Sequence, residues 1–197
     1  MAGARPIEPA VTELAAALAV LRQGGVVAAP TETLVGLLAD ALDPAAVARV
    51  AEAKGRAQDQ PIALILPDAG ALDRVATAVT PRTRELARAH WPGPLTLLVR
   101  ARPELSPLCT RDGKVGVRVP GPSAAADLVR AFGGPLTATS ANLSGGPAVA
   151  ETAALDPVLA ARVHVLAGRS PGGEPSTLVD ATGPELVVLR QGAVTPE

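Results

Sequence analysis

Residues 135–143 read Pro-Leu-Thr-Ala-Thr-Ser-Ala-Asn-Leu, and this stretch guides the interpretation of the whole chain. Its first part, Leu136 to Thr139, has the composition of a short buried strand. The strand ends in Ser140 and Asn142, and glycines follow. An apolar strand provides a fixed mount, and a hydroxyl and an amide at its tip provide short, directed hydrogen bonds. A binding site and a simple polar turn explain this stretch equally well when it is taken alone.

Helical and strand-like patterns alternate on both sides of this stretch. We expect helices over residues 11–21, 44–53, 69–77, 81–90, 125–132 and 151–162. We expect strands over residues 26–29, 62–66, 95–99, 115–119, 136–139, 163–166, 176–180 and 186–190. This alternation predicts an α/β fold, with a twisted mixed sheet flanked by helices. We expect one domain over residues 1–197, with no additional C-terminal domain.

The composition excludes several classes of protein. A hydrophobic content of 48% with 19% charged residues is typical of globular rather than disordered chains. The net charge of −1 gives no general argument for binding nucleic acids or membranes. One cysteine excludes an internal disulfide framework and a cysteine-rich metal site. No secretory signal pattern or membrane-length apolar run is present, so we predict a cytoplasmic protein without membrane contact.

Two further polar clusters lie where predicted elements end. Thr31, Glu32 and Thr33 directly follow a predicted strand and offer two hydroxyls and a carboxylate to a small polar ligand, although a capped turn is the alternative. Lys54 and Arg56 lie at the end of a predicted helix. Cations there interact favourably with the helix dipole, and they also suit phosphate binding. The spacing does not decide between these two roles.

Two arginines belong to other predicted strands, Arg118 in the middle of one and Arg190 at the end of another. Arg118 interrupts an apolar strand, so its desolvation must be offset by an anion. The anion is either a structural carboxylate, with Glu32 and Asp40 as candidates, or a bound substrate. Ser176 repeats the pattern of a hydroxyl at a strand edge, and Arg190 supplies another cation near the end of the chain.

Together these segments resemble the YrdC-type threonylcarbamoyl-adenylate synthases over about residues 23–192. The matching stretches are Pro30-Thr31-Glu32-Thr33 with Gly36, Lys54-Gly55-Arg56, Trp91-Pro92-Gly93-Pro94-Leu95-Thr96, Val117-Arg118-Val119-Pro120, Ser140-Ala141-Asn142-Leu143-Ser144-Gly145, Ser176-Thr177-Leu178-Val179-Asp180 and Leu189-Arg190. Each stretch is weak evidence alone, but their common order makes the resemblance specific.

The resemblance implies a nucleotidyltransferase that converts L-threonine, bicarbonate and ATP into threonylcarbamoyl-AMP and pyrophosphate. Magnesium would accompany the ATP, and no protein residue is assigned as a metal ligand. The product would pass to a downstream threonylcarbamoyl transferase complex that modifies the tRNA adenosine next to the anticodon. Positioning and electrostatic stabilisation would provide the catalysis, because the reaction needs no enzyme nucleophile.

The resemblance also assigns roles to residues. Lys54 and Arg56 would act in catalysis and bind ATP, and Thr31, Thr33 and Arg118 would bind threonine and bicarbonate. Further ATP contacts would come from Ser140, Asn142, Ser176 and Arg190. The segment around Trp91 is interpreted as a structural anchor.

The chain departs from the family pattern in ways that leave alternatives open. Val35 stands where the family commonly has an aromatic residue, so threonine selectivity is less firmly predicted than ATP binding. One alternative is a non-catalytic relative that binds double-stranded RNA or tRNA. Another is an adenylating enzyme that uses a different amino-acid acceptor.

Overall fold

The computed structural model describes residues 11–55 and 60–196. Its helices are α1 (Val11–Arg22), α2 (Pro44–Ala53), α3 (Pro81–His90), α4 (Ala124–Phe132) and α5 (Pro157–Ala160), with 3-10 turns at Ala69–Arg74, Pro107–Cys109 and Thr152–Ala154. Its strands are β1 (Val27–Pro30), β2 (Val35–Leu38), β3 (Leu64–Ile65), β4 (Ala76–Ala78), β5 (Leu95–Ala101), β6 (Lys114–Arg118), β7 (Leu136–Thr137), β8 (Thr139–Ser140), β9 (His164–Val165), β10 (Thr177–Asp180) and β11 (Val187–Arg190).

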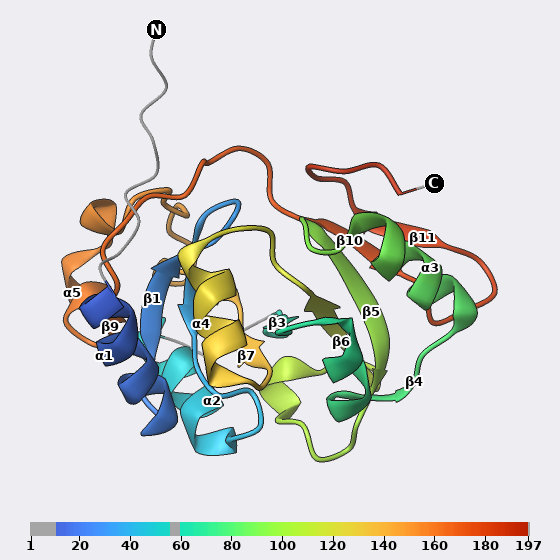
Figure 1. The fold of residues 1–197 in the computed structure, drawn as a ribbon, viewed down its shortest axis with the longest axis horizontal. Helices are drawn as coiled ribbons and strands as arrows, with labels where there is room; N and C mark the ends of the chain where they lie inside the picture. Colours follow the sequence, from blue (N-terminus) through green and yellow to red (C-terminus); the bar gives the residue numbers. More distant parts are fainter. Residues whose placement is uncertain (1–10, 56–59, 197) are drawn as a thin grey trace, which may run out of the picture.

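The predicted α/β fold with mixed strands flanked by helices is confirmed, but the strands are divided between two sheets instead of forming the single sheet expected (Figure 1). The smaller sheet has the order β8-β2-β1-β9. The larger has the order β11-β10-β5-β6-β3-β7, with β4 paired to β5. Each sheet contains parallel and antiparallel pairs: β1 runs parallel to β9 and antiparallel to β2, and β5 runs parallel to β10 and antiparallel to β6.

Helix starts are stabilised by capping side chains. Asp43 accepts a hydrogen bond from the Ala45 amide at the start of α2, with Pro44 at the first helical position. Helix α4 begins at the Ser123 cap and ends at Gly133, whose φ of 75° lies in the left-handed region. These caps explain why both helices were located correctly from the sequence.

The structure differs from the predicted elements in several places. The expected strand over 136–139 is divided between β7 of the larger sheet and β8 of the smaller one. The expected helix over 69–77 is a 3-10 turn over Ala69–Arg74, and strand β4 follows it. The expected helix over 151–162 is reduced to Thr152–Ala154 and Pro157–Ala160, because Pro157 and its cap Asp156 restart the chain. Strand β2 was missed, because its residues were interpreted as part of the preceding polar segment.

The core consists almost entirely of aliphatic side chains. Helices α1 and α4 pack beside β1, with Leu21 and Leu128 buried between them. Helix α3 covers the β5–β10 region, and its residues Leu86 and Ala87 belong to the same buried cluster as Leu97. Because the interior is closely packed, the strands of both sheets hold the side chains at their ends in fixed positions. No helix within the described ranges is both long and apolar enough to cross a membrane.

Candidate active site

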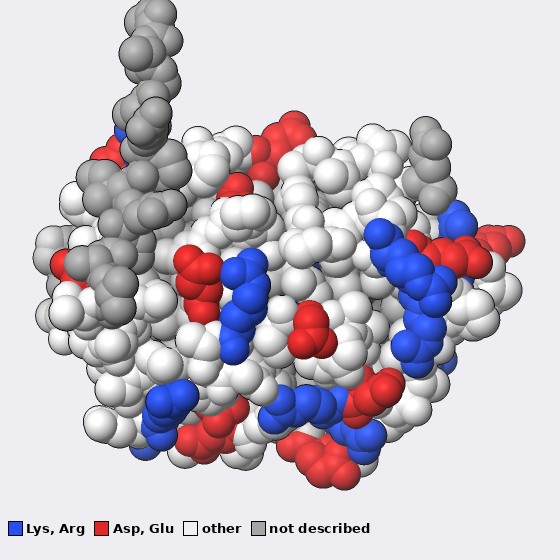
Figure 2. All heavy atoms as spheres, viewed as in Figure 1, with Lys and Arg blue, Asp and Glu red and all other residues white. Residues whose placement is uncertain are grey.

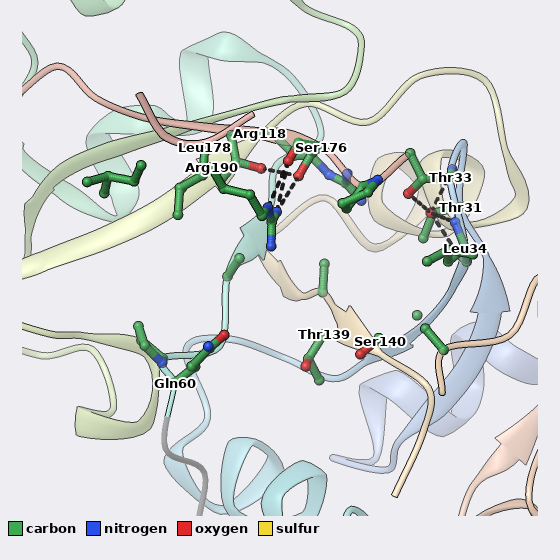
Figure 3. A pocket seen from close by; sticks show the side chains of 18 of the residues that line it. Thr31, Thr33, Leu34, Gln60, Arg118, Thr139, Ser140, Ser176, Leu178 and Arg190 are labelled. Atoms are coloured by element: carbon green, nitrogen blue, oxygen red, sulfur yellow. Dashed lines mark hydrogen bonds between the residues drawn. The ribbon is translucent and has the colours of Figure 1, made fainter. Parts of the chain in front are cut away.

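A cavity of about 1140 Å³ is lined by residues of both sheets (Figure 3). It is large enough for a nucleotide together with a small second ligand, because typical ligand pockets measure about 300–1,000 Å³. Most of the predicted site residues line it: Thr31, Thr33, Lys54, Arg118, Ser140, Asn142, Ser176 and Arg190. Arg56 lies outside the described residues, so its predicted role stays a prediction. The fold therefore brings together segments that are far apart in the sequence.

The Thr31–Thr33 turn is held by its own hydroxyl groups. The Thr31 hydroxyl donates to the Leu34 carbonyl at 2.7 Å and accepts from the Thr33 amide at 3.2 Å. The Thr31 amide donates to the Ser170 hydroxyl at 3.1 Å, a contact that the sequence did not reveal. The turn is therefore capped, as the alternative interpretation of the sequence predicted, and it also forms part of the cavity wall. Thr31 shapes the turn, and Thr33 presents a second hydroxyl beside it.

Gly36 allows the next strand to approach this turn closely. A Cβ atom at Gly36 would lie 3.2 Å from the Thr31 methyl group, closer than ordinary van der Waals contact. Gly36 also pairs with Ser140 across β2 and β8, which places the two polar strand ends beside each other. A side chain at this position would separate the Thr31 turn from the Ser140 segment.

Lys54 ties the Ser140–Asn142 segment to helix α2. Its ammonium group donates to the Ser140 carbonyl at 2.6 Å, the Asn142 carbonyl at 2.9 Å and the Asn142 side-chain oxygen at 3.3 Å. The Asn142 side-chain nitrogen donates to the Leu143 and Gly146 carbonyls at 2.9 and 2.7 Å. Asn142 therefore uses its amide to shape the loop, while the buried Lys54 holds the loop against the cavity.

The burial of Lys54 changes its acidity. Desolvation lowers the pKa of the Lys54 ammonium from 10.5 to about 8, because an apolar environment disfavours the charged form. The three oxygen atoms that accept hydrogen bonds from the nitrogen stabilise the protonated, charged form of Lys54. Lys54 is therefore a cation at neutral pH that loses its proton under mildly basic conditions.

Arg118 is the last residue of β6 rather than a mid-strand residue, and it is buried. One of its terminal nitrogens lies 3.0 Å from a Glu32 carboxylate oxygen. Glu32 was one of the two structural partners considered from the sequence, and Asp40 is not the partner. Burial lowers the pKa of Arg118, the Glu32 charge opposes that shift, and the nearby Arg190 charge adds to it. Arg118 therefore has a structural carboxylate and still faces the cavity.

Ser176 and Arg190 form one group with Thr96. Arg190 donates to the Ser176 carbonyl from two nitrogens at 2.9 and 3.2 Å, and to the Ser176 hydroxyl at 3.3 Å. The hydroxyls of Ser176 and Thr96 are 2.9 Å apart. Thr96 was interpreted only as part of a structural segment. A signal was available, since Thr96 is the one polar residue in the predicted strand over residues 95–99.

The ion pair between Lys114 and Asp180 also lines the cavity. Lys114 lies 2.6 Å from the Asp180 carboxylate, which in addition accepts hydrogen bonds from the amide and the hydroxyl of Thr182. The carboxylate is desolvated, but its hydrogen bonds with Lys114 and Thr182 outweigh that effect and lower the pKa of Asp180. This pair adds no net charge, and Arg111 and Asp112, which also line the cavity, carry opposite charges. The positive character of the cavity therefore comes from Lys54, Arg118 and Arg190.

Val35 is fully buried in β2 and also lines the cavity. Its amide donates to the Val149 carbonyl at 2.9 Å, which fixes the strand next to the 147–150 segment. A small aliphatic side chain therefore stands at this wall. Among the described residues, no cluster of three or more His, Cys, Asp or Glu side chains could hold a metal ion.

The outer surface gives no support to an extended nucleic-acid interface on the face that Figure 2 shows. Lys and Arg are interspersed with Asp and Glu there. Phosphate-backbone binding requires concentrated positive charge. Three of the cations that line the cavity are already engaged: Lys54 is buried against carbonyl groups, and Lys114 and Arg118 are paired with carboxylates.

Comparison with known proteins agrees with this geometry. The Sua5/YciO/YrdC family model, described as "Telomere recombination", matches residues 19–192. The threonylcarbamoyl-AMP synthase of Bacillus subtilis is 35% identical over 189 residues, which cover 94% of this chain and 55% of that protein. The Thiobacillus denitrificans protein of the same name is 39% identical over 168 residues, covering 84% of this chain and 89% of that protein.

A solved structure shows the same arrangement. Sua5 of Pyrococcus abyssi, complexed with L-threonine, superposes with a TM-score of 0.84 at 33% identity and covers 91% of this chain and 54% of its own. The chain thus spans about half the length of the Bacillus and Pyrococcus relatives. The family match extends over both sheets and all the described cavity residues, so the chain belongs to the Sua5/YciO/YrdC family.

Proposed function

We propose that the chain forms threonylcarbamoyl-AMP and pyrophosphate from L-threonine, bicarbonate and ATP, and so acts as a nucleotidyltransferase. The observation that carries this proposal is the cavity itself, which combines hydroxyl groups with the partly or fully buried cations Lys54, Arg118 and Arg190. Relatives named threonylcarbamoyl-AMP synthase, and one relative solved with L-threonine, support the choice of substrates.

The proposed chemistry needs no covalent bond to the protein. The threonine amine adds to carbon dioxide derived from bicarbonate and loses a proton, which gives a carbamate. A carbamate oxygen then attacks the α-phosphorus of ATP, and the bond from that phosphorus to the bridging oxygen of pyrophosphate breaks. ATP, the carbamate and both products are anionic, so cations held away from water stabilise them strongly.

The residues divide into two groups by position. The Thr31–Thr33 turn and Arg118 suit the amino acid and its carbamate, because they offer hydroxyls beside a buried guanidinium. The Ser140–Asn142 segment and the Ser176–Arg190 group suit the nucleotide, and Lys54 links the former to α2. Each group is held by hydrogen bonds to the backbone, so the substrates meet a preorganised site.

Magnesium fits this site only with few protein ligands. Asp112 and Asp180 are the carboxylates among the cavity-lining residues, and Asp180 is already engaged by Lys114 and Thr182. Magnesium readily binds through phosphate oxygens and water. When bound with ATP it would share the phosphate charge with the cations of the cavity.

The product is a reactive mixed anhydride, and we propose that it passes to a threonylcarbamoyl transferase complex that modifies tRNA. The test of the reaction is pyrophosphate release from purified protein with ATP and magnesium, across a panel of amino acids, with and without bicarbonate. Release that requires both L-threonine and bicarbonate is the expected result. Release with another amino acid would assign a different acceptor, and none with any would refute the reaction.

A further inference from the structure

The Glu32–Arg118 ion pair joins the two sheets at the cavity. Glu32 lies in the turn between β1 and β2 of the smaller sheet, and Arg118 is the last residue of β6 in the larger one. Their charged groups are 3.0 Å apart, and the two side chains are 10% and 9% exposed. Desolvating two charges is costly, and a well-packed apolar pair stabilises a fold as well or better. Stability alone is therefore a weak explanation for this pair.

The two partners differ in what they face. Arg118 lines the cavity, whereas Glu32 is not among the lining residues. Both Glu32 carboxylate oxygens are buried and accept no hydrogen bond from the described residues, and their one interaction there is the ion pair with Arg118. A guanidinium has five N–H donors. Within the described part of the chain, Glu32 is the only partner of Arg118, so donors remain for a group in the cavity.

The local charge balance suits a single negative charge. Arg118 and Arg190 are close enough for their charges to interact, and one carboxylate, Glu32, compensates them in part. The remaining charge of one unit matches a monoanion. The fork of a guanidinium matches the two coplanar oxygens of a carboxylate or carbamate.

We propose that Glu32 is a positioning residue that holds the Arg118 guanidinium in the orientation that receives the carboxylate or carbamate of the amino-acid substrate. This inference rests on the proposed function and adds a role that acts through Arg118. It makes the reach of the Glu32 side chain the critical property, because the acceptor fixes where the guanidinium lies. The charge of Glu32 is then more important for stability than for substrate affinity.

Two substitutions separate reach from charge. Glu32→Gln keeps an oxygen acceptor at the same reach but removes the charge. Glu32→Asp keeps the charge but withdraws the acceptor by one methylene group. The measurements are the KM values for L-threonine and ATP in pyrophosphate release, calorimetric binding of L-threonine without ATP, and the thermal midpoint. The matched control is Asp127→Asn, which breaks the exposed Arg130–Asp127 pair, 2.9 Å long.

If Glu32 is a positioning residue, Glu32→Asp should be the more damaging variant for L-threonine affinity and Glu32→Gln the more damaging one for stability. Glu32→Asp should raise the KM and the dissociation constant for L-threonine about tenfold, the loss expected when one charge-assisted hydrogen bond is misplaced. Glu32→Gln should change both values less than about threefold while lowering the thermal midpoint more than Glu32→Asp does. Neither variant should alter the KM for ATP by more than about twofold, and the control should behave as the wild type.

The inference is overturned if Glu32→Asp keeps the wild-type affinity for L-threonine, or if both variants raise the two KM values equally. Should Glu32→Gln not fold, because the buried Arg118 charge lacks compensation, Glu32→Asp alone still tests the reach. Failure of the proposed reaction is distinguishable. A wild-type protein that binds L-threonine without releasing pyrophosphate refutes the reaction, and the binding comparison of the variants still decides the role of Glu32.

Discussion

Protonation of Lys54 should control the activity of this protein between pH 7 and 9. Burial lowers the pKa of its ammonium from 10.5 to about 8. At pH 9 a group with that pKa is about 10% protonated, whereas an ordinary lysine would be about 97% protonated. If the reaction requires the charged ammonium, kcat/KM for ATP at pH 9 should fall to about a tenth of its value at pH 7.

The control is Lys54→Arg, because a guanidinium keeps its charge throughout this range. Pyrophosphate release should be measured for both proteins from pH 6.5 to 9.5 with saturating L-threonine and bicarbonate. Titration of the substrates affects both proteins equally, so the ratio of wild type to variant isolates Lys54. The ratio should fall with an apparent pKa of about 8. A ratio that stays constant across the range would refute the reasoning.

Stability should move in the opposite direction to activity. The pKa of Lys54 is lower in the folded protein than in the unfolded chain, so the unfolded chain binds more protons between pH 8 and 10.5. The free energy of unfolding contributed by this residue therefore rises with pH in that window. Comparison with Lys54→Met in urea denaturation isolates this contribution, because Met has no titrating group. An equal pH dependence in both proteins would contradict the assignment.

Three further outcomes are expected. Thr96→Val, which keeps the shape but removes the hydroxyl 2.9 Å from the Ser176 hydroxyl, should raise the KM for ATP about two- to tenfold in the pyrophosphate assay, and an unchanged KM would remove Thr96 from the site. Leu97→Ala, at a fully buried position, should lower the free energy of unfolding by about 2–5 kcal/mol in urea, whereas Val187→Ala, at a position 49% exposed, should change it by less than about 0.5 kcal/mol. Burial raises the pKa of Cys109 to about 12, so its thiol should react with a disulfide reagent at pH 8 only after unfolding, and rapid reaction of the folded protein would contradict its buried position.

Much of the fold could be predicted from local chemistry. The Asp43 and Ser123 caps and the glycine after α4 are signals within one or two turns of the chain, and the structure follows them. Strand β2 could not be recognised in the same way. It is four residues long, and its placement depends on pairing with β1 and β8. The division of the strands between two sheets likewise depends on long-range pairing.

The site was predicted as a set of residues but not as a network. The sequence pointed to Lys54 as a phosphate-binding cation, and the structure shows it bound to carbonyl groups of the Ser140–Asn142 segment. No local pattern reveals such a contact, because its partners are 86 and 88 residues away in the chain. The Ser170 contact with Thr31 escaped prediction for the same reason.

The most direct test of the central claim is the identity of the product. Purified protein should be incubated with ATP, magnesium, L-threonine and carbon-13-labelled bicarbonate, and the nucleotides analysed at once by mass spectrometry. The account predicts threonylcarbamoyl-AMP that carries the label in its carbamoyl carbon, with pyrophosphate in equal amount. Pyrophosphate without a labelled adenylate, or an adenylate formed without bicarbonate, would contradict it.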